Sequence, residues 1–160
     1  PQCTVEVLIP DFQGNWNALK IVAQSKPDVI NHNIETVPSL YKKVRHRGNY
    51  QLSLKLIKRI KELDKNIVSK SGIMVGLGET KEEIIKVMED LLAHNCEVIT
   101  IGQYLRPSKA HLPVEKYYTD EEFKELEEIG YKLGFKEVFS GKLVRSSYHA
   151  DEVYNEVIGR

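Results

Sequence analysis

The sequence has 160 residues, a length that suits one domain of ordinary size or a piece of a larger one. Charged residues make up 29% of the chain and hydrophobic residues 41%, which argues against a disordered polypeptide and predicts a soluble globular one. Lys plus Arg number 23, as do Asp plus Glu, and no apolar run approaches the ~20 residues that cross a bilayer, so neither nucleic acid nor a membrane is expected as a partner.

The first half of the chain predicts strands and helices in alternation. The expected elements are a strand at 5–9, a helix at 15–24, a strand at 28–30 and a long helix that starts after Asn49. The first strand stops at Pro10, and the second runs into the polar triplet Asn31-His32-Asn33. Apolar residues recur every three or four positions in the long helix, so one side of it is expected to cover a core.

The second half continues the alternation. The expected elements are a strand at 67–75, a helix at 80–92, a strand at 98–101, a helix at 119–133, a short strand near Val138 and a last helix from about Ala150. Thr80 with Glu83, and Thr119 with Glu122, have the spacing of a capping box at a helix start. Gly134 is placed to end the helix before it.

This order predicts an α/β fold in which a parallel sheet carries helices outside it, because the strands are apolar on both faces. Four principal strands are too few to close a barrel, so the chain is either a small open sheet or an arc of a (β/α) barrel. We expect one domain over 1–160, with βα units to about 105 and a C-terminal helical extension over 106–160. No Met precedes Pro1, and the chain opens almost directly into a strand, as an internal fragment would.

The two cysteines, Cys3 and Cys96, are far apart and have no CxxC or CxxxCxxC neighbour. They cannot form an iron–sulfur or zinc site by themselves. We expect ordinary thiols of a reducing compartment. Each precedes a predicted strand, so both are expected near the amino ends of the strands.

Polar residues gather where the predicted strands end. They are Asp11 after the first strand, His32, Asn33 and Glu35 after the second, Gly76, Gly78 and Glu79 after the third, and Gln103 and Arg106 after the fourth. The carboxyl ends of parallel strands meet at one edge of a sheet, so these residues predict a site there. We expect Asp11, Asn33, Glu79 and Arg106 to share one cavity.

Each of these signals has a plainer alternative when taken alone. Asp11 and His32 are also natural turn residues. Two glycines before a capped helix let a phosphate, a carboxylate or an adenine edge approach the backbone, but they also serve simply to turn the chain. Arg106 suits either the surface or a carboxylate ligand. The pair Ser146-Ser147 before a helix is most simply an N-cap.

Long motifs at these positions resemble lipoyl synthases. They are VEVLIPDFQG at 5–14, INHNIETVPSLYKKVR at 30–45, KSGIMVGLGET at 70–80, IGQYLRPS at 101–108, HLPVEKYY at 111–118 and VRSSYHAD at 144–151. The resemblance covers essentially the whole chain, and its motifs are far more specific than a lone glycine-rich loop.

The resemblance implies a sulfurtransferase with the radical SAM fold, a partial barrel of six βα units. Its cofactors are S-adenosylmethionine and two [4Fe–4S] clusters, whose cysteine ligands lie upstream of the part represented here. The reaction inserts two sulfur atoms at C6 and C8 of an octanoyl group carried on a lipoyl carrier domain. That domain is the expected partner, together with an iron–sulfur carrier protein. Bacterial cytoplasm is the expected location, with mitochondria as the alternative.

The resemblance also gives individual residues their expected roles. Ser147 matches a serine that is the fourth ligand of the auxiliary cluster, and Arg145 matches the arginine beside it. The motif that holds Gly76, Gly78 and Glu79 runs along the adenine of S-adenosylmethionine. Asn33 and Glu35 are expected at its ribose or methionine part, and Gln103 and Arg106 are expected to face the cavity.

Two other functions stay open from the sequence. The chain is also compatible with a non-catalytic half-barrel module that binds a partner. Without the family, the loop at 76–80 is compatible with a phosphate-binding α/β enzyme. Even as part of a lipoyl synthase, the chain alone is expected to be inactive because it lacks the cluster cysteines.

Overall fold

The computed structural model describes residues 3–146 of the chain. Strands and helices alternate through it, as the sequence predicts. The strands are β1 (Glu6–Leu8), β2 (Val29–Asn31), β3 (Val68–Val75), β4 (Val98–Gln103) and β5 (Glu137–Gly141). The α-helices are α1 (Trp16–Gln24), α2 (Tyr41–Val44), α3 (Tyr50–Leu63), α4 (Lys81–Ala93) and α5 (Asp120–Leu133), with 3-10 turns at Phe12–Gly14 (η1) and Pro38–Leu40 (η2).

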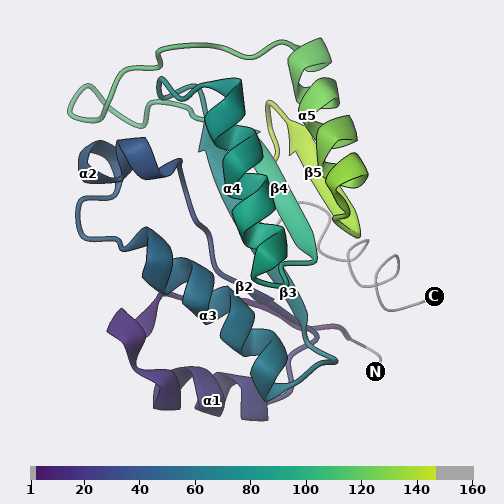
Figure 1. Ribbon diagram of the computed structural model, residues 1–160. Coiled ribbons are helices and arrows are strands. Elements are labelled where there is room, and N and C mark those ends of the chain that lie inside the picture. Colours follow the sequence, from purple (N-terminus) through teal and green to yellow (C-terminus); the bar gives the residue numbers. More distant parts are fainter. Residues whose placement is uncertain (1–2, 147–160) are drawn as a thin grey trace.

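The five strands form one sheet in the order β1-β2-β3-β4-β5, and every neighbouring pair is parallel. Figure 1 shows α3, α4 and α5 side by side on one face of this sheet, with α1 next to α3. The predicted parallel arc with strands adjacent in chain order is therefore confirmed. Crossover connections of one hand between parallel strands place successive helices on the same face.

The helix boundaries follow from local signals in the sequence. Both predicted capping boxes are formed, at Thr80 with Glu83 and at Thr119 with Glu122. Gly134 ends α5 with φ of 115°, a left-handed conformation that glycine adopts without steric cost. Each signal fixes a helix end at the position that the sequence predicts.

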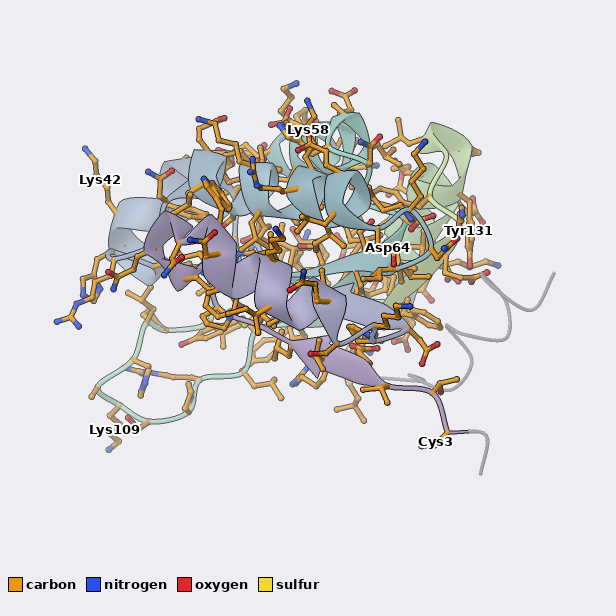
Figure 2. All side chains as sticks on the ribbon, turned by 90° about the horizontal axis from the view of Figure 1, so that it is seen from below. Cys3, Lys42, Lys58, Asp64, Lys109 and Tyr131 are labelled. Atoms are coloured by element: carbon orange, nitrogen blue, oxygen red, sulfur yellow. The ribbon has the colours of Figure 1, made fainter. Side chains whose placement is uncertain are left out.

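The core lies between the sheet and its helices. Alternate residues of the strands point toward the helices, where they meet the apolar stripes of α3, α4 and α5. The largest buried cluster includes Ile73, Ile101, Leu54, Met88 and Phe123. The opposite face of the sheet carries no α-helix of the described chain. Figure 2 shows Lys58 of α3 on the helix side and Lys109 on the other side.

β5 lies within the stretch that the sequence assigns to a C-terminal extension, yet it continues the sheet. Its backbone pairs with β4 over five residue pairs, from Val98 with Glu137 to Gly102 with Gly141. The predicted short strand near Val138 is thus a full member of the sheet. The chain after β5 turns back toward the open face, where Val144 and Arg145 lie over Gly102 of β4.

The two cysteines lie near the amino ends of the strands, as predicted, and differ in exposure. Cys3 is exposed, whereas Cys96 is buried. Burial raises the pKa of the Cys96 thiol to about 12, with the charge of Glu97 acting in the same direction. We expect a thiol reagent at neutral pH to modify Cys3 quickly and Cys96 only after unfolding, because the thiolate is the reactive form. Peptide mass spectrometry of the native and denatured chain checks this, and equal rates at both cysteines would contradict it.

Within residues 3–146, no helix has both the length and the apolar character needed to cross a bilayer.

Candidate functional site

The open face of the sheet holds a pocket of about 170 Å³. Its lining comes from four parts of the chain: the segment after β2, strand β3, strand β4 and the segment after β5. The lining residues are Asn33, Glu35, Gly72, Ile73, Met74, Thr100, Gly102, Val144, Arg145 and Ser146. Three of them, Asn33, Glu35 and Arg145, are among the site residues that the sequence predicts.

Glycine keeps the floor of this pocket open. A Cβ atom on Gly72 would lie 2.7 Å from Thr100 Oγ1 and 2.8 Å from Asn33 Oδ1, closer than real Cβ contacts. Gly72 and Thr100 are paired residues on β3 and β4, so both belong to the same face. Any side chain at position 72 would occupy the space that the pocket now offers.

Asn33 and Glu35 reach the pocket because the chain departs from regular strand geometry after β2. The Glu35 N–H donates to the Gly72 carbonyl at 3.0 Å, and the Met74 N–H donates to the Glu35 carbonyl at 2.9 Å. Glu35 adopts φ of 72°, which a residue other than glycine rarely does. Such strain occurs preferentially at functional sites.

The side chains of Asn33 and Glu35 offer acceptors to a ligand. Asn33 Oδ1 is buried and has no hydrogen-bond partner among the described residues. A buried acceptor without a partner is costly, so its presence beside a pocket points to a donor on a ligand. Burial raises the pKa of Glu35, which the charge of Arg45 and a hydrogen bond from Asn33 oppose.

Arg45 supports this segment from behind. Its Nη1 donates to the Asn33 carbonyl at 3.3 Å, to Tyr41 Oη at 3.3 Å and to Ser53 Oγ at 3.1 Å. Tyr41 in turn donates to the Ile34 carbonyl at 2.6 Å. The backbone that presents Asn33 and Glu35 is therefore fixed by α2 and α3.

His32 belongs to the same support and is not exposed to the pocket. Its Nδ1 lies 2.9 Å from the Ile9 carbonyl, so Nδ1 carries the proton, and Nε2 accepts from Ser53 Oγ at 2.9 Å. Burial lowers the pKa of His32, which keeps the ring neutral at physiological pH. Both ring nitrogens are satisfied, which favours the structural alternative for His32.

Glu79 and Gly76 meet inside the loop that follows β3. Glu79 Oε1 accepts from the Gly76 N–H at 2.6 Å and from Tyr118 Oη at 3.0 Å, and Oε2 accepts from the Leu77 N–H at 2.9 Å. Gly76 and Gly78 have φ of 103° and 109°, values that favour glycine. These contacts explain the loop without a ligand, and the expected role along the adenine stays a prediction.

Gln103 joins three parts of the loop region. Its Nε2 donates to the carbonyls of Val75, Tyr104 and Lys116, and its Oε1 accepts from the Tyr118 N–H at 2.9 Å. The side chain of Gln103 thus makes four hydrogen bonds inside the protein. Its expected role at the cavity stays a prediction.

Arg106 and Asp11 also bind their own segments. Arg106 donates to the carbonyls of His111 and Lys109 in the exposed loop, and Asp11 accepts from the Gln13 N–H at 2.9 Å. Of the four residues expected to share one cavity, Asn33 lines the pocket, while Asp11, Glu79 and Arg106 have these other neighbours. Their cofactor roles stay predictions.

Arg145 lies over β4 on the open face. A Cβ atom on Gly102 would lie 3.2 Å from Arg145 Nη1, which itself donates to the Val144 carbonyl at 2.6 Å. The guanidinium is thus at the pocket wall, where it can meet a carboxylate. Ser147, the expected iron ligand, lies outside the described residues.

The sequence analysis missed polar residues of the open face, namely Glu6, Asn31, Lys70 and Thr100. The sequence carries a signal for two of them: Glu6 is the only charged residue of β1, and Lys70 is the only charged residue of β3. Such charges are rarely buried unless they are paired.

The described residues do not form a ligand set for a metal cluster. Among residues 3–146, no three His, Cys, Asp or Glu side chains come together in a way that could hold a metal ion. The pocket instead offers the amide oxygen of Asn33, the carboxyl group of Glu35 and the guanidinium of Arg145. These groups suit a small molecule that has both a carboxylate and cationic or hydrogen-bond donor groups.

Comparison with known proteins gives consistent matches. The family described as the radical SAM superfamily matches residues 1–91. A lipoyl synthase of Caldanaerobacter subterraneus subsp. tengcongensis is 64% identical over 151 residues, which are 94% of this chain and 53% of that protein. A lipoyl synthase of Neisseria meningitidis serogroup C is 56% identical over 159 residues, covering 99% of this chain and 49% of the relative. The chain spans about half the length of these relatives.

Proposed function

Because the chain belongs to the radical SAM superfamily, we propose that it forms the carboxyl-terminal part of a lipoyl synthase and binds S-adenosylmethionine on the open face of its sheet. The identity to lipoyl synthases over nearly the whole chain carries this proposal. The side chains that line the pocket agree with it, because they suit S-adenosylmethionine. About half of each relative lies outside the segment that aligns with this chain. Under the proposal, that region is the other half of the enzyme.

The residues of the pocket suit S-adenosylmethionine, which has an ammonium group, a sulfonium, a carboxylate and ribose hydroxyls. Asn33 Oδ1 lacks a donor, which the ammonium or a hydroxyl supplies. Glu35 stands beside it as a second acceptor, and Arg145 suits the carboxylate. The pocket of about 170 Å³ is smaller than the ~300–1,000 Å³ of typical small-molecule sites, so the described residues form only part of the proposed site.

When bound, S-adenosylmethionine supplies the radical that removes hydrogen from the octanoyl chain. The residues of this chain bind and orient it: Asn33 and Glu35 fix one end, and Gly72 lets it approach the sheet. Both [4Fe–4S] clusters are assigned to cysteines of the other half, with Ser147 as the additional ligand of the auxiliary cluster. The octanoylated carrier domain is the proposed partner, and cytoplasm is the proposed location.

The assay for this function uses a completed protein, defined as this chain joined behind the part of the Caldanaerobacter relative that precedes the matched segment. We expect the completed protein, with its clusters assembled, to convert an octanoylated carrier domain to the lipoylated form, detected by mass spectrometry as insertion of two sulfur atoms. Binding of a sugar phosphate, with no affinity for S-adenosylmethionine, would overturn the proposal.

Filling the pocket is expected to weaken cofactor binding. In the completed protein, Gly72→Val should lower the affinity for S-adenosylmethionine at least about tenfold, the effect of losing about 1.4 kcal/mol of binding free energy, while the β-branched residue remains compatible with a strand. Calorimetric titration measures the affinity. Thr100→Val is the matched control because it keeps the volume beside Gly72 and only replaces the Thr100 hydroxyl by a methyl group. Unchanged affinity of Gly72→Val would place the cofactor elsewhere.

A further inference from the structure

The chain after β5 crosses the open face of the sheet toward β2. The Val144 carbonyl lies only 2.3 Å from where a Cβ atom of Gly102 would be, so the backbone passes directly over β4 at a position without a side chain. Val144 itself is buried, with 6% of its surface exposed. We call Val144–Ser146 the crossing segment.

Asn31 binds the end of this segment, and a chain of polar contacts through Glu6 and Lys70 supports Asn31. Asn31 Nδ2 donates to the Ser146 carbonyl at 3.2 Å and to Glu6 Oε1 at 3.1 Å. Lys70 Nζ donates to Glu6 Oε1 at 3.1 Å and to Oε2 at 2.9 Å. Glu6, Asn31 and Lys70 come from β1, β2 and β3, three neighbouring strands.

The ion pair is strongly shielded from water. The Lys70 side chain is 0% exposed and the Glu6 side chain 13% exposed. A charge pair in such surroundings is costly to bury and is not the simplest way to stabilise a sheet. Its geometry has a clear consequence, however: the Glu6 carboxylate holds one N–H of Asn31, which fixes the amide plane and directs Asn31 Nδ2 at the Ser146 carbonyl.

We infer that Glu6, Asn31 and Lys70 are positioning residues that seat the crossing segment on the open face, with Gly102 as the passage that lets it cross. The hydrogen bond from Asn31 holds the chain at Ser146, the residue between Arg145 and Ser147. Its importance for catalysis rests on the proposed function, in which Ser147 is a ligand of the auxiliary cluster and Arg145 binds the carboxylate of S-adenosylmethionine. The seating itself is a property of the polypeptide alone.

Limited trypsin digestion of the completed protein without cofactors tests the seating. Cleavage after Arg145 requires the crossing segment to leave the sheet, because a protease needs a stretch of released chain. Cleavage after Lys109, in the exposed loop, is the internal reference (Figure 2). Mass spectrometry gives the ratio of the two rates for each variant.

Asn31→Leu removes the donor to Ser146 at similar volume, and we expect the ratio to rise about tenfold, as for the loss of one half-buried hydrogen bond. Gly102→Ala attacks the other end of the segment, since its methyl group would collide with the Val144 carbonyl, and should have a similar effect. In the double variant, the increase should be smaller than the product of the two single increases, because both act on the same segment.

Lys61→Met is the matched control. It breaks another shielded ion pair, between Lys61 and Glu97 at 2.6 Å, near the amino ends of the strands and away from the crossing segment. The ratio should stay unchanged in this control. An equal rise in Lys61→Met, or no rise in both Asn31→Leu and Gly102→Ala, would overturn the seating. Because no cofactor is present, a failed seating is distinguishable from a failed proposal of function.

Discussion

Replacing Ser147 by Ala in the completed protein is expected to reduce lipoyl formation at least about a hundredfold while leaving the fold intact. Under the proposed function, the fourth iron ligand of the auxiliary cluster is the Ser147 oxygen and not a cysteine thiolate. An oxygen ligand binds iron in a cluster less strongly than a thiolate, which suits a cluster that must give up its sulfur. A serine that only caps a helix costs about 1 kcal/mol when lost and would leave turnover nearly normal.

Two variants sharpen this experiment. Ser146→Ala is the matched control, because the structure engages the carbonyl of Ser146, which this change retains. Ser147→Cys supplies a softer ligand, so the cluster should assemble while sulfur transfer slows. Lipoylated carrier is measured by mass spectrometry, and the melting temperature of each variant reports the fold. Normal turnover by Ser147→Ala would return this residue to a capping role.

The second large effect concerns the 160-residue chain by itself, which we expect to release no 5′-deoxyadenosine from S-adenosylmethionine. A [4Fe–4S] cluster with an open iron needs three thiolates, and the chain has two cysteines. Cys96 is buried and its pKa is raised to about 12, so it resists forming the thiolate that binds iron. Cys3 is exposed and comes from a different part of the chain.

Anaerobic reconstitution with iron and sulfide, followed by reductant and S-adenosylmethionine, measures this activity. The completed protein, treated in the same way, is the positive control and should release 5′-deoxyadenosine. Cluster absorbance at one [4Fe–4S] per chain together with release of 5′-deoxyadenosine from the 160-residue chain would contradict the prediction, and would require ligands other than cysteine.

Local signals predict most of the fold. The capping boxes at Thr80 and Thr119 and the glycine at 134 each act within one turn of a helix, so a single sequence contains all the information they need. The alternation of apolar strands with amphipathic helices predicts the parallel sheet for the same reason. The local pattern predicts a strand near Val138, but the membership of β5 in the sheet depends on pairing with β4, which no local pattern encodes.

The candidate site was predictable only in part. Position at a strand end selects Asn33 and Glu35, which line the pocket, but it also selects Glu79 and Gln103, which bind the loops around them. A carboxylate that accepts from backbone N–H groups and one that faces a ligand have the same sequence signature. Asn31 and Ser146 are 115 positions apart in the sequence, so no local pattern near either residue predicts their contact.

The order of the strands has a further consequence for biosynthesis. Each strand pairs with the one made immediately before it, so every new strand leaves the ribosome when its hydrogen-bonding template already exists. A sheet of this kind can grow in one direction without waiting for distant segments, which keeps unpaired edges short-lived. The crossing segment follows β5 in the chain, so it closes over five strands that have already been made. Errors in the pairing of these strands would remove the surface to which the segment binds.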